Sequence, residues 1–416
     1  MPSVEADSTI AVKTSTAAGD AGPRGLIGAD RLSAIARCWI VVALAYYAFD
    51  LSGQTRDGWT NGDGRPLGDD FVNYWSGAFL AWHGRVIEIF DWNAFHAFQQ
   101  SFTGPSLQFY HYGYPPVLLV LTAPFAFIPY LPALGVWLVS SWYAFYRALR
   151  LAAPETALLL SLATPALFIN AIGGQNGAWT AALIGGGLVL IDRRPVVAGI
   201  LFGLLIYKPH LGVLLPVALI AGQRWRALGA AAATAIALVA VSLVLFGADL
   251  WLAYSENLAT LKRVILEDGA GVWHRMLSVF VFGRRLGLDV GSAYALQIAF
   301  GAIAVFVVAR SWWKNDPPAI RNALVILGTC LATPYLQDYD LVMGAFVVVW
   351  LGSARAQALV SPRSAQVAMA AILLLPLLAA TIAKTTGFSI GPLLIAPVFA
   401  LFARISPRQE RGFARA

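Results

Sequence analysis

Charge is scarce in this sequence. Only 12% of its 416 residues are charged, whereas 58% are hydrophobic and the mean hydropathy is +0.67. Soluble globular chains carry roughly 25% charged residues, so the composition excludes an ordinary soluble domain and predicts one polytopic membrane domain. Cysteine is scarce too. The two cysteines, Cys38 and Cys330, lie in apolar segments, which excludes a disulfide framework and a cysteine-based zinc site.

Several common site motifs are also missing. The sequence has no Walker loop, no GxGxxG after a strand, no HExxH and no GxSxG in a credible context. The run Gly185–Gly187 lies inside an apolar segment, where it favours close packing of helices. We therefore expect neither a cofactor nor a metal ion.

The basic residues indicate membrane topology rather than nucleic-acid binding. The net charge is +7, but the arginines gather at the ends of apolar segments, as in cytoplasmic loops. Arg24, Arg31 and Arg37 precede or open the first apolar segment, Ala36–Leu51. This places the N-terminus in the cytoplasm and predicts a multi-pass protein of the inner (plasma) membrane, with the next loop facing the periplasm or exterior.

These signals predict an all-α integral membrane protein with about 12–13 membrane segments. We expect a disordered cytoplasmic tail at 1–30, a transmembrane domain at 31–404 and a basic cytoplasmic tail at 405–416. The two large outer loops are 52–113 and 247–291. The first contains two short helices rich in Trp and Phe, Phe71–Trp82 and Trp92–Phe102, a composition typical of helices that lie in the membrane interface.

One apolar segment conflicts with the charge rule. If Tyr114–Leu131 and Ala133–Leu151 both span the membrane, Arg147 and Arg150 fall on the wrong side. Tyr114–Leu131 contains four prolines, which break or kink helices. Either this segment is bent or re-entrant, or the charge rule fails locally.

The polar stretch Gly68–Gly84 follows the first membrane segment in the sequence and carries the adjacent acids Asp69 and Asp70 just before an amphipathic run. Adjacent carboxylates raise each other's pKa unless a cation or hydrogen-bond donors hold them, and a carboxylate placed against a hydroxyl can act as general base. The alternative is a solvated pair of loop acids. Tyr74 lies four residues after Asp70, on the same helical face.

Other polar residues interrupt the apolar segments that follow. Lys208 is the most notable, because an ionisable group within the membrane is costly and is usually functional, although a lysine can also extend to the surface. Arg275 is able to bind a phosphate with two donors, with a surface ion pair as the alternative. The remaining candidate substrate-binding residues are His111, Tyr114, Gln175, Asn176, His210 and, in the segment Gln337–Asp340, Asp338.

Taken in order, these stretches resemble glycosyltransferase family 87, a bacterial group that includes polyprenyl-phosphomannose-dependent α-mannosyltransferases. The resemblance runs through DFVNYWSGAFLAWHG, YGYPPVLLVLTAPFAFIP, GGQNGAWTAALIGGG and AGILFGLLIYKPHLGVLLPVALIAGQRWRAL, and more loosely through SVF and ATPYLQDYDL. It covers roughly residues 65 to 350. The region Trp273–Arg275 departs from the family pattern.

The resemblance implies a type C glycosyltransferase that takes a hexose, mannose by analogy, from a polyprenyl-phosphate-linked sugar to a lipid or glycan acceptor. Asp70 matches the catalytic acid, with Asp69 as the alternative base, and Tyr74, Gln175 and Lys208 match further family positions. The implied reaction inverts the sugar and needs no metal. The rival functions are a multi-pass transporter or lipid-linked sugar flippase and, with less support, a polysaccharide polymerase or ligase with essential Arg and His in the loop 247–291.

Overall fold

The computed structural model describes residues 26–55 and 58–405, and within this part it is all helical, with no strand. This confirms the predicted fold class. The predicted terminal tails fall almost wholly outside the described residues. The α-helices are α1 Ala29–Gly53, α2 Phe71–Trp82, α3 Trp92–Thr103, α4 Val117–Leu121, α5 Tyr130–Ala152, α6 Ala157–Ala163, α7 Pro165–Ile172, α8 Gly177–Leu190, α9 Pro195–Leu204, α10 Leu215–Ala221, α11 Trp225–Phe246, α12 Ala248–Leu261, α13 Val279–Arg285, α14 Val290–Trp313, α15 Pro318–Ala332, α16 Gly344–Leu351, α17 Ala354–Gln357, α18 Pro362–Thr386 and α19 Gly391–Ile405.

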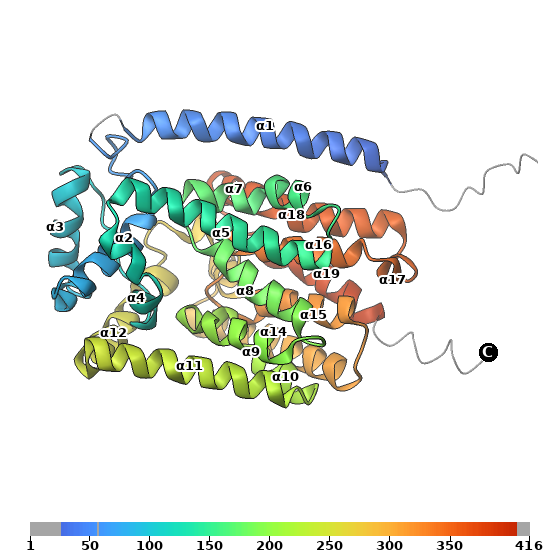
Figure 1. Cartoon of the computed structure of the whole chain (residues 1–416). Coiled ribbons are helices and arrows are strands. Elements are labelled where there is room, and N and C mark those ends of the chain that lie inside the picture. Colours follow the sequence, from blue (N-terminus) through green and yellow to red (C-terminus); the bar gives the residue numbers. More distant parts are fainter. Residues whose placement is uncertain (1–25, 56–57, 406–416) are drawn as a thin grey trace, which may run out of the picture.

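The long helices lie side by side as a bundle, with α1 and α11 on opposite sides (Figure 1). Within the described residues, four helices are long and apolar enough to cross a membrane: α1, α11, α14 and α18. Several other predicted segments are shorter apolar helices of 10–17 residues. The apolar segment Pro154–Asn170 is divided further, into the still shorter helices α6 and α7, which meet at Thr164 before Pro165.

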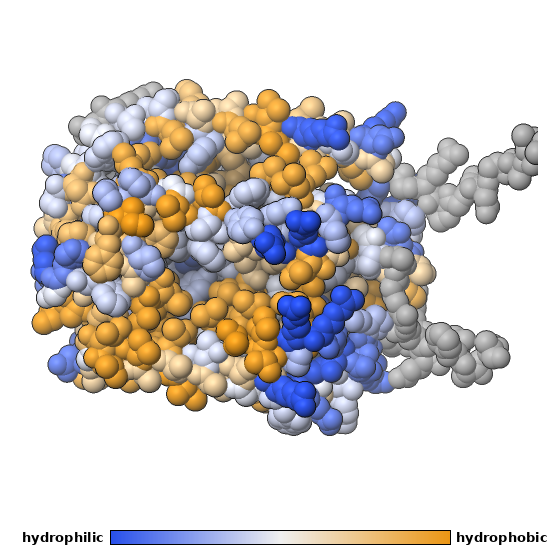
Figure 2. Space-filling view, in the orientation of Figure 1, coloured by the Kyte–Doolittle hydropathy of each residue, from blue (hydrophilic) through white to orange (hydrophobic). Residues whose placement is uncertain are grey.

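The two ends of the bundle differ in polarity. Hydrophilic side chains gather at the end where the described chain begins and finishes, while the middle of the visible face is largely hydrophobic (Figure 2). Arginines mark helix termini there: Arg150 lies in the last turn of α5 and Arg224 immediately precedes α11. The opposite end is formed by α2, α3 and α12, which come from the two predicted outer loops (Figure 1).

The proline-rich segment is broken, which removes the conflict in the charge pattern. It forms the short helix α4, a 3₁₀ turn at Ala123–Phe127 and extended backbone at Ile128, and the long helix α5 starts only at Tyr130. Two tryptophans of α2 bind carbonyl groups of this segment: Trp75 Nε1 donates to Ile128 O (2.9 Å) and Trp82 Nε1 donates to Leu119 O (3.1 Å). Irregular backbone at membrane depth requires such partners.

The two helices predicted in the first outer loop are present as α2 and α3, but α2 does not lie on a lipid surface. Ten of its twelve residues are buried. Its aromatic side chains pack inside the protein, as shown by Phe71 against Trp137 of α5 (ring centroids 5.9 Å apart). The aromatic content therefore reflects a buried helix, and α2 carries the site residues on a rigid support.

Candidate active site

Two loops meet backbone to backbone at the centre of the site. Asp70 N donates to Gly173 O (3.2 Å), so the loop before α2 is bonded to the loop before α8. Gly174 has φ +55°, and a Cβ added there would lie 2.1 Å from Gly68 O. Only glycine permits this approach. The contact places Asp70 beside the next residue of the second loop, Gln175.

The two adjacent aspartates have different partners. Asp69 accepts hydrogen bonds from Arg65 Nε (3.1 Å) and from the Tyr110 hydroxyl (2.6 Å). Arg65 also bonds Asp50 of α1 (2.9 Å) and the Ile172 carbonyl (3.2 Å). Asp69 has φ +46°, a left-handed conformation that Asp tolerates better than most residues. Its carboxylate is thus held by a cation and a hydroxyl.

Among residues 26–55 and 58–405, no cation is bonded to Asp70. The Asp70 carboxylate accepts hydrogen bonds from the Gln175 side-chain amide and from Asn73 Nδ2 (3.3 Å). The side-chain oxygen of Asn73, Oδ1, in turn accepts from Gln99 Nε2 of α3 (3.0 Å). Burial, followed by the charge of Asp69, raises the pKa of Asp70 to about 7, against the opposing effects of Arg275, Gln175 and Lys208. Asp70 is therefore poised to exchange a proton near neutral pH.

A hydroxyl cluster lies beside Asp70. The Tyr74 hydroxyl bonds Gln175 Oε1 (3.2 Å) and the Tyr114 hydroxyl (2.9 Å), and the Asn176 amide donates to Tyr74 (3.1 Å) and Tyr114 (2.9 Å). The structure thus brings together four residues predicted from the sequence. Asn176 is fully buried behind the two tyrosines, where it orients them.

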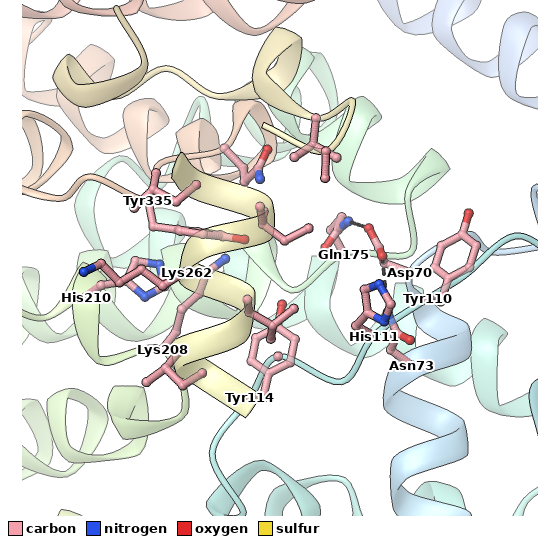
Figure 3. A pocket seen from close by; sticks show the side chains of 18 of the residues that line it. Asp70, Asn73, Tyr110, His111, Tyr114, Gln175, Lys208, His210, Lys262 and Tyr335 are labelled. Carbon is pink, nitrogen blue, oxygen red and sulfur yellow. Dashed lines mark hydrogen bonds between the residues drawn. The ribbon is translucent and has the colours of Figure 1, made fainter. Parts of the chain in front are cut away.

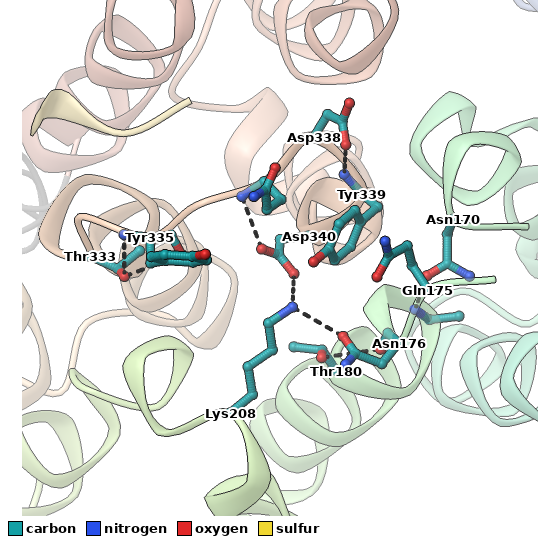
Figure 4. Close-up of polar contacts among 12 residues, drawn as sticks. Asn170, Gln175, Asn176, Thr180, Lys208, Thr333, Tyr335, Asp338, Tyr339 and Asp340 are labelled. Carbon is teal, nitrogen blue, oxygen red and sulfur yellow. Dashed lines mark hydrogen bonds and ion pairs between the residues drawn. The ribbon is translucent and has the colours of Figure 1, made fainter. Parts of the chain in front are cut away.

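Lys208 does not extend to the surface. It is 3% exposed, and its ammonium donates to Asp340 Oδ1 (2.6 Å) and Asn176 Oδ1 (3.0 Å) (Figure 4). Asp340 is fully buried. An ammonium group has three donors, so two are engaged by these described residues and one is left for a ligand.

Arg275 forms a two-pronged ion pair with Asp338. Its Nε and Nη2 each lie 3.0 Å from a carboxylate oxygen of Asp338. Burial alone would lower the pKa of Arg275, but Asp338 raises it above its ordinary value, so the guanidinium stays charged. Tyr339 lies between the two cations, with Lys208 Nζ 4.6 Å and Arg275 Cζ 5.7 Å from its ring centroid. One short segment therefore positions both cations.

These groups surround one cavity of about 710 Å³. Its wall includes Asp69, Asp70, Tyr74, His111, Tyr114, Gln175, Lys208, His210 and Arg275, all predicted from the sequence. Figure 3 shows Asp70 and Gln175 on one side and Lys208 and His210 on the other. Two predicted residues, Asn176 and Asp338, are buried behind this wall and hold the groups that form it.

The two predicted histidines differ in their surroundings. His111 stacks on Trp92 of α3, with ring centroids 4.0 Å apart, and burial followed by the charge of His96 lowers its pKa, so it is neutral at pH 7. His210 faces Tyr335 edge-on (5.8 Å), and its buried Nε2 has no hydrogen-bond partner among the described residues. His210 therefore lines the cavity and carries a buried polar atom that has no partner in the described part of the chain.

Several site residues were missed by sequence reasoning. Asn73 lies one helical turn after Asp70, so the spacing in the sequence could have predicted it as a neighbour of Asp70. Arg65 and Tyr110 had no such signal. Asp340 lies in the candidate segment Gln337–Asp340, but its partner Lys208 is apparent only in the folded chain. Among residues 26–55 and 58–405, no group of three or more His, Cys, Asp or Glu side chains is arranged to hold a metal ion.

Comparison with known proteins agrees with this geometry. The family model for glycosyltransferase family 87 matches residues 112–334, more than half of the chain. Among curated proteins and among solved structures, no match was found. The matched region contains Tyr114, Gln175, Lys208 and Arg275 of the cavity wall. The chain therefore belongs to glycosyltransferase family 87 and is a membrane glycosyltransferase.

Proposed function

We propose that this enzyme transfers a hexose, mannose by family analogy, from a polyprenyl-phosphate-linked sugar to a hydroxyl of a lipid or glycan. The observation that carries the proposal is one cavity with two kinds of charged group in its wall. Asp70, a carboxylate with no cation bonded to it in the described part of the chain, lies on one side, and the cations Lys208 and Arg275 lie elsewhere. A transferase with a phosphate leaving group needs a base at the acceptor and cations at the phosphate.

Asp70 is the general base in this proposal. Its carboxylate removes the proton from the acceptor hydroxyl as that oxygen attacks the anomeric carbon of the sugar. The bond between the anomeric carbon and the phosphate oxygen breaks, and its electron pair leaves with the polyprenyl phosphate. Attack opposite the leaving group inverts the anomeric centre, so a β-linked donor yields an α-glycoside. A pKa of about 7 suits a base working near neutral pH.

Lys208 and Arg275 bind the departing phosphate. Arg275 uses Nε and Nη2 for Asp338, which leaves its other N–H groups for the ligand, and Lys208 retains one donor. Asp340 balances the charge of Lys208, and Asp338 balances that of Arg275, so both cations are stable before the phosphate binds. His210 Nε2 is a further candidate ligand for the phosphate. Gln175 and Tyr74 orient the sugar or the acceptor.

The prenyl chain requires an apolar exit from the cavity. Leu258 and Leu261 of α12 and Ile265 of the following π-helical turn supply apolar wall, and Leu258 is 45% exposed. We infer that the cavity opens to the outer face of the cytoplasmic (inner) membrane, because the arginines that mark cytoplasmic ends lie at the opposite end of the bundle.

The experiment is transfer of labelled sugar from a panel of polyprenyl-phosphate sugars and nucleotide sugars, using membranes that contain the full chain and an added lipid extract as acceptor. We expect incorporation from one polyprenyl-phosphate sugar, with release of polyprenyl phosphate, and none from the nucleotide sugars. Incorporation from a nucleotide sugar alone, by purified protein, would overturn the donor assignment. Movement of the intact lipid-linked sugar across vesicles without transfer would favour the flippase.

A further inference from the structure

The segment 108–111, which belongs to no helix, carries two aromatic rings that each stack on a residue of α3. Phe109 stacks on His96, with ring centroids 4.0 Å apart and an interplanar angle of 15°, and His111 stacks on Trp92 at 4.0 Å and 30°. Trp92 and His96 lie four residues apart on α3, so they occupy one face of that helix. Each ring of the segment therefore has one face against α3.

The side chains of this segment have two kinds of partner. Phe109 and His111 both contact α3, while the Tyr110 hydroxyl between them in the sequence bonds Asp69 (2.6 Å). All three residues line the cavity that contains Asp70. Tyr110 thus links the aromatic pair directly to the aspartate pair.

Phe109 lines the cavity, and 55% of this large apolar side chain is exposed. Its position is nevertheless well defined, since His96 stacks on one face. A ring held in this way loses little conformational freedom when a ligand covers its other face. His111 is uncharged at pH 7, because burial lowers its pKa, so it presents a neutral ring. The pair forms a preorganised, shallowly angled surface, with centroids 6.1 Å apart and ring planes tilted by 32°.

We propose that Phe109 and His111 form a stacking platform for a pyranose ring. Aromatic faces carry partial negative charge, and they attract the weakly positive C–H groups that project from the flat face of a pyranose. The sugar's hydroxyl groups stay at its rim, where the polar groups of the cavity wall are available. This inference rests on the proposed transferase function and adds a subsite to it. The pyranose is supplied either by a glycan acceptor or by the donor.

Binding is tested first without any donor. The full-length protein, purified in a detergent without a sugar headgroup, is titrated with methyl α-D-mannopyranoside by saturation-transfer NMR, in wild type, Phe109→Ala and Phe109→Trp. Trp59→Ala is the matched control, since Trp59 is a partly exposed aromatic of the same loop that does not line the cavity. We expect Phe109→Ala to weaken binding by about five-fold, with Phe109→Trp and Trp59→Ala near wild type. Equal binding in Phe109→Ala and Trp59→Ala would overturn the platform.

Transfer kinetics then distinguish the two sources of the sugar. If the platform holds the acceptor, Phe109→Ala raises the KM for the acceptor and leaves that for the donor unchanged. If it holds the donor sugar, the reverse applies. A KM change for neither substrate, with kcat also unchanged, would count against the platform. Because the titration uses no donor, a failure of the polyprenyl-phosphate assignment leaves the binding result intact, and the two failures are distinguishable.

Discussion

Replacing Asp69 by Asn is expected to shift the pH dependence of transfer to lower pH. Burial and then the charge of Asp69 raise the pKa of Asp70 to about 7, so in wild type the rate rises with pH through that value as the base loses its proton. Asn removes the neighbouring charge. Asn also tolerates the left-handed backbone of position 69. Its Oδ1, placed where Oδ2 of Asp69 lies, accepts from Arg65, while its amide nitrogen takes the place of the other oxygen and donates to the Tyr110 hydroxyl.

The size of the shift follows from the charges around Asp70. Two carboxylates about 6 Å apart at an effective dielectric constant of about 20 repel each other by about 3 kcal/mol, or about two pKa units. Arg65 partly neutralises Asp69, which reduces the effect to about one unit. Arg275 and Lys208, the cations that lower the pKa of Asp70, are unchanged by the substitution. The rate at about pH 6 relative to about pH 8 should therefore rise about five-fold.

The assay is the initial rate of sugar transfer across this pH range, with saturating donor. Arg65→Met provides the opposite perturbation, because it leaves the negative charge of Asp69 without its cation. The acid limb of the pH–rate profile, in which the rate rises with pH, should then move to higher pH. The double variant should return towards wild type. An acid limb that stays in place in Asp69→Asn, or moves to higher pH, would refute the assignment of that limb to Asp70.

Three further substitutions test contacts that hold the site residues in place. Lys208→Met leaves Asp340 buried without its cation, so we expect a loss of about 3–5 kcal/mol of stability, seen as a lower Tm in detergent and partly recovered when Asp340→Asn is added. Gly174→Ala places a Cβ against Gly68 O and should abolish transfer, with weak or no folding by size-exclusion chromatography. Arg275→Lys keeps the charge but loses the two-pronged bond, so the donor KM should rise while Tm changes little.

Much of the fold was predictable because its signals are local. Apolar segments and the arginines at their ends predicted an all-α polytopic bundle, which the structure confirms. The four prolines of Tyr114–Leu131 left two alternatives, a bent segment or a local failure of the charge rule, and the structure shows a broken segment. The number of full-length spans was less predictable. A segment such as Pro154–Asn170 has enough apolar residues to cross the membrane, but its kink at Thr164 depends on how neighbouring helices bind the freed backbone groups.

In the candidate site, too, some residues were predictable from the sequence and others were not. Asp70, Tyr74, Gln175 and Lys208 were identifiable because they are polar residues in or beside apolar segments and match positions of the family, and all four line the cavity. Their partners were not, because a partner is defined by distance in space. Asp340 lies 132 residues from Lys208 in the sequence, and the different environments of Asp69 and Asp70 depend on tertiary contacts.

The central claim is that Asp70, and not Asp69, is the base of the transfer reaction. The most direct measurement compares single-turnover transfer by Asp70→Asn and Asp69→Asn at about pH 8, with donor saturating and donor binding checked separately. We expect Asp70→Asn to lose about 10²–10⁴-fold in rate, as for removal of a general base, while Asp69→Asn stays within about ten-fold of wild type because Asp70 and its bond to Gln175 remain. Loss of transfer in Asp69→Asn with full transfer in Asp70→Asn, both binding donor normally, would contradict the claim.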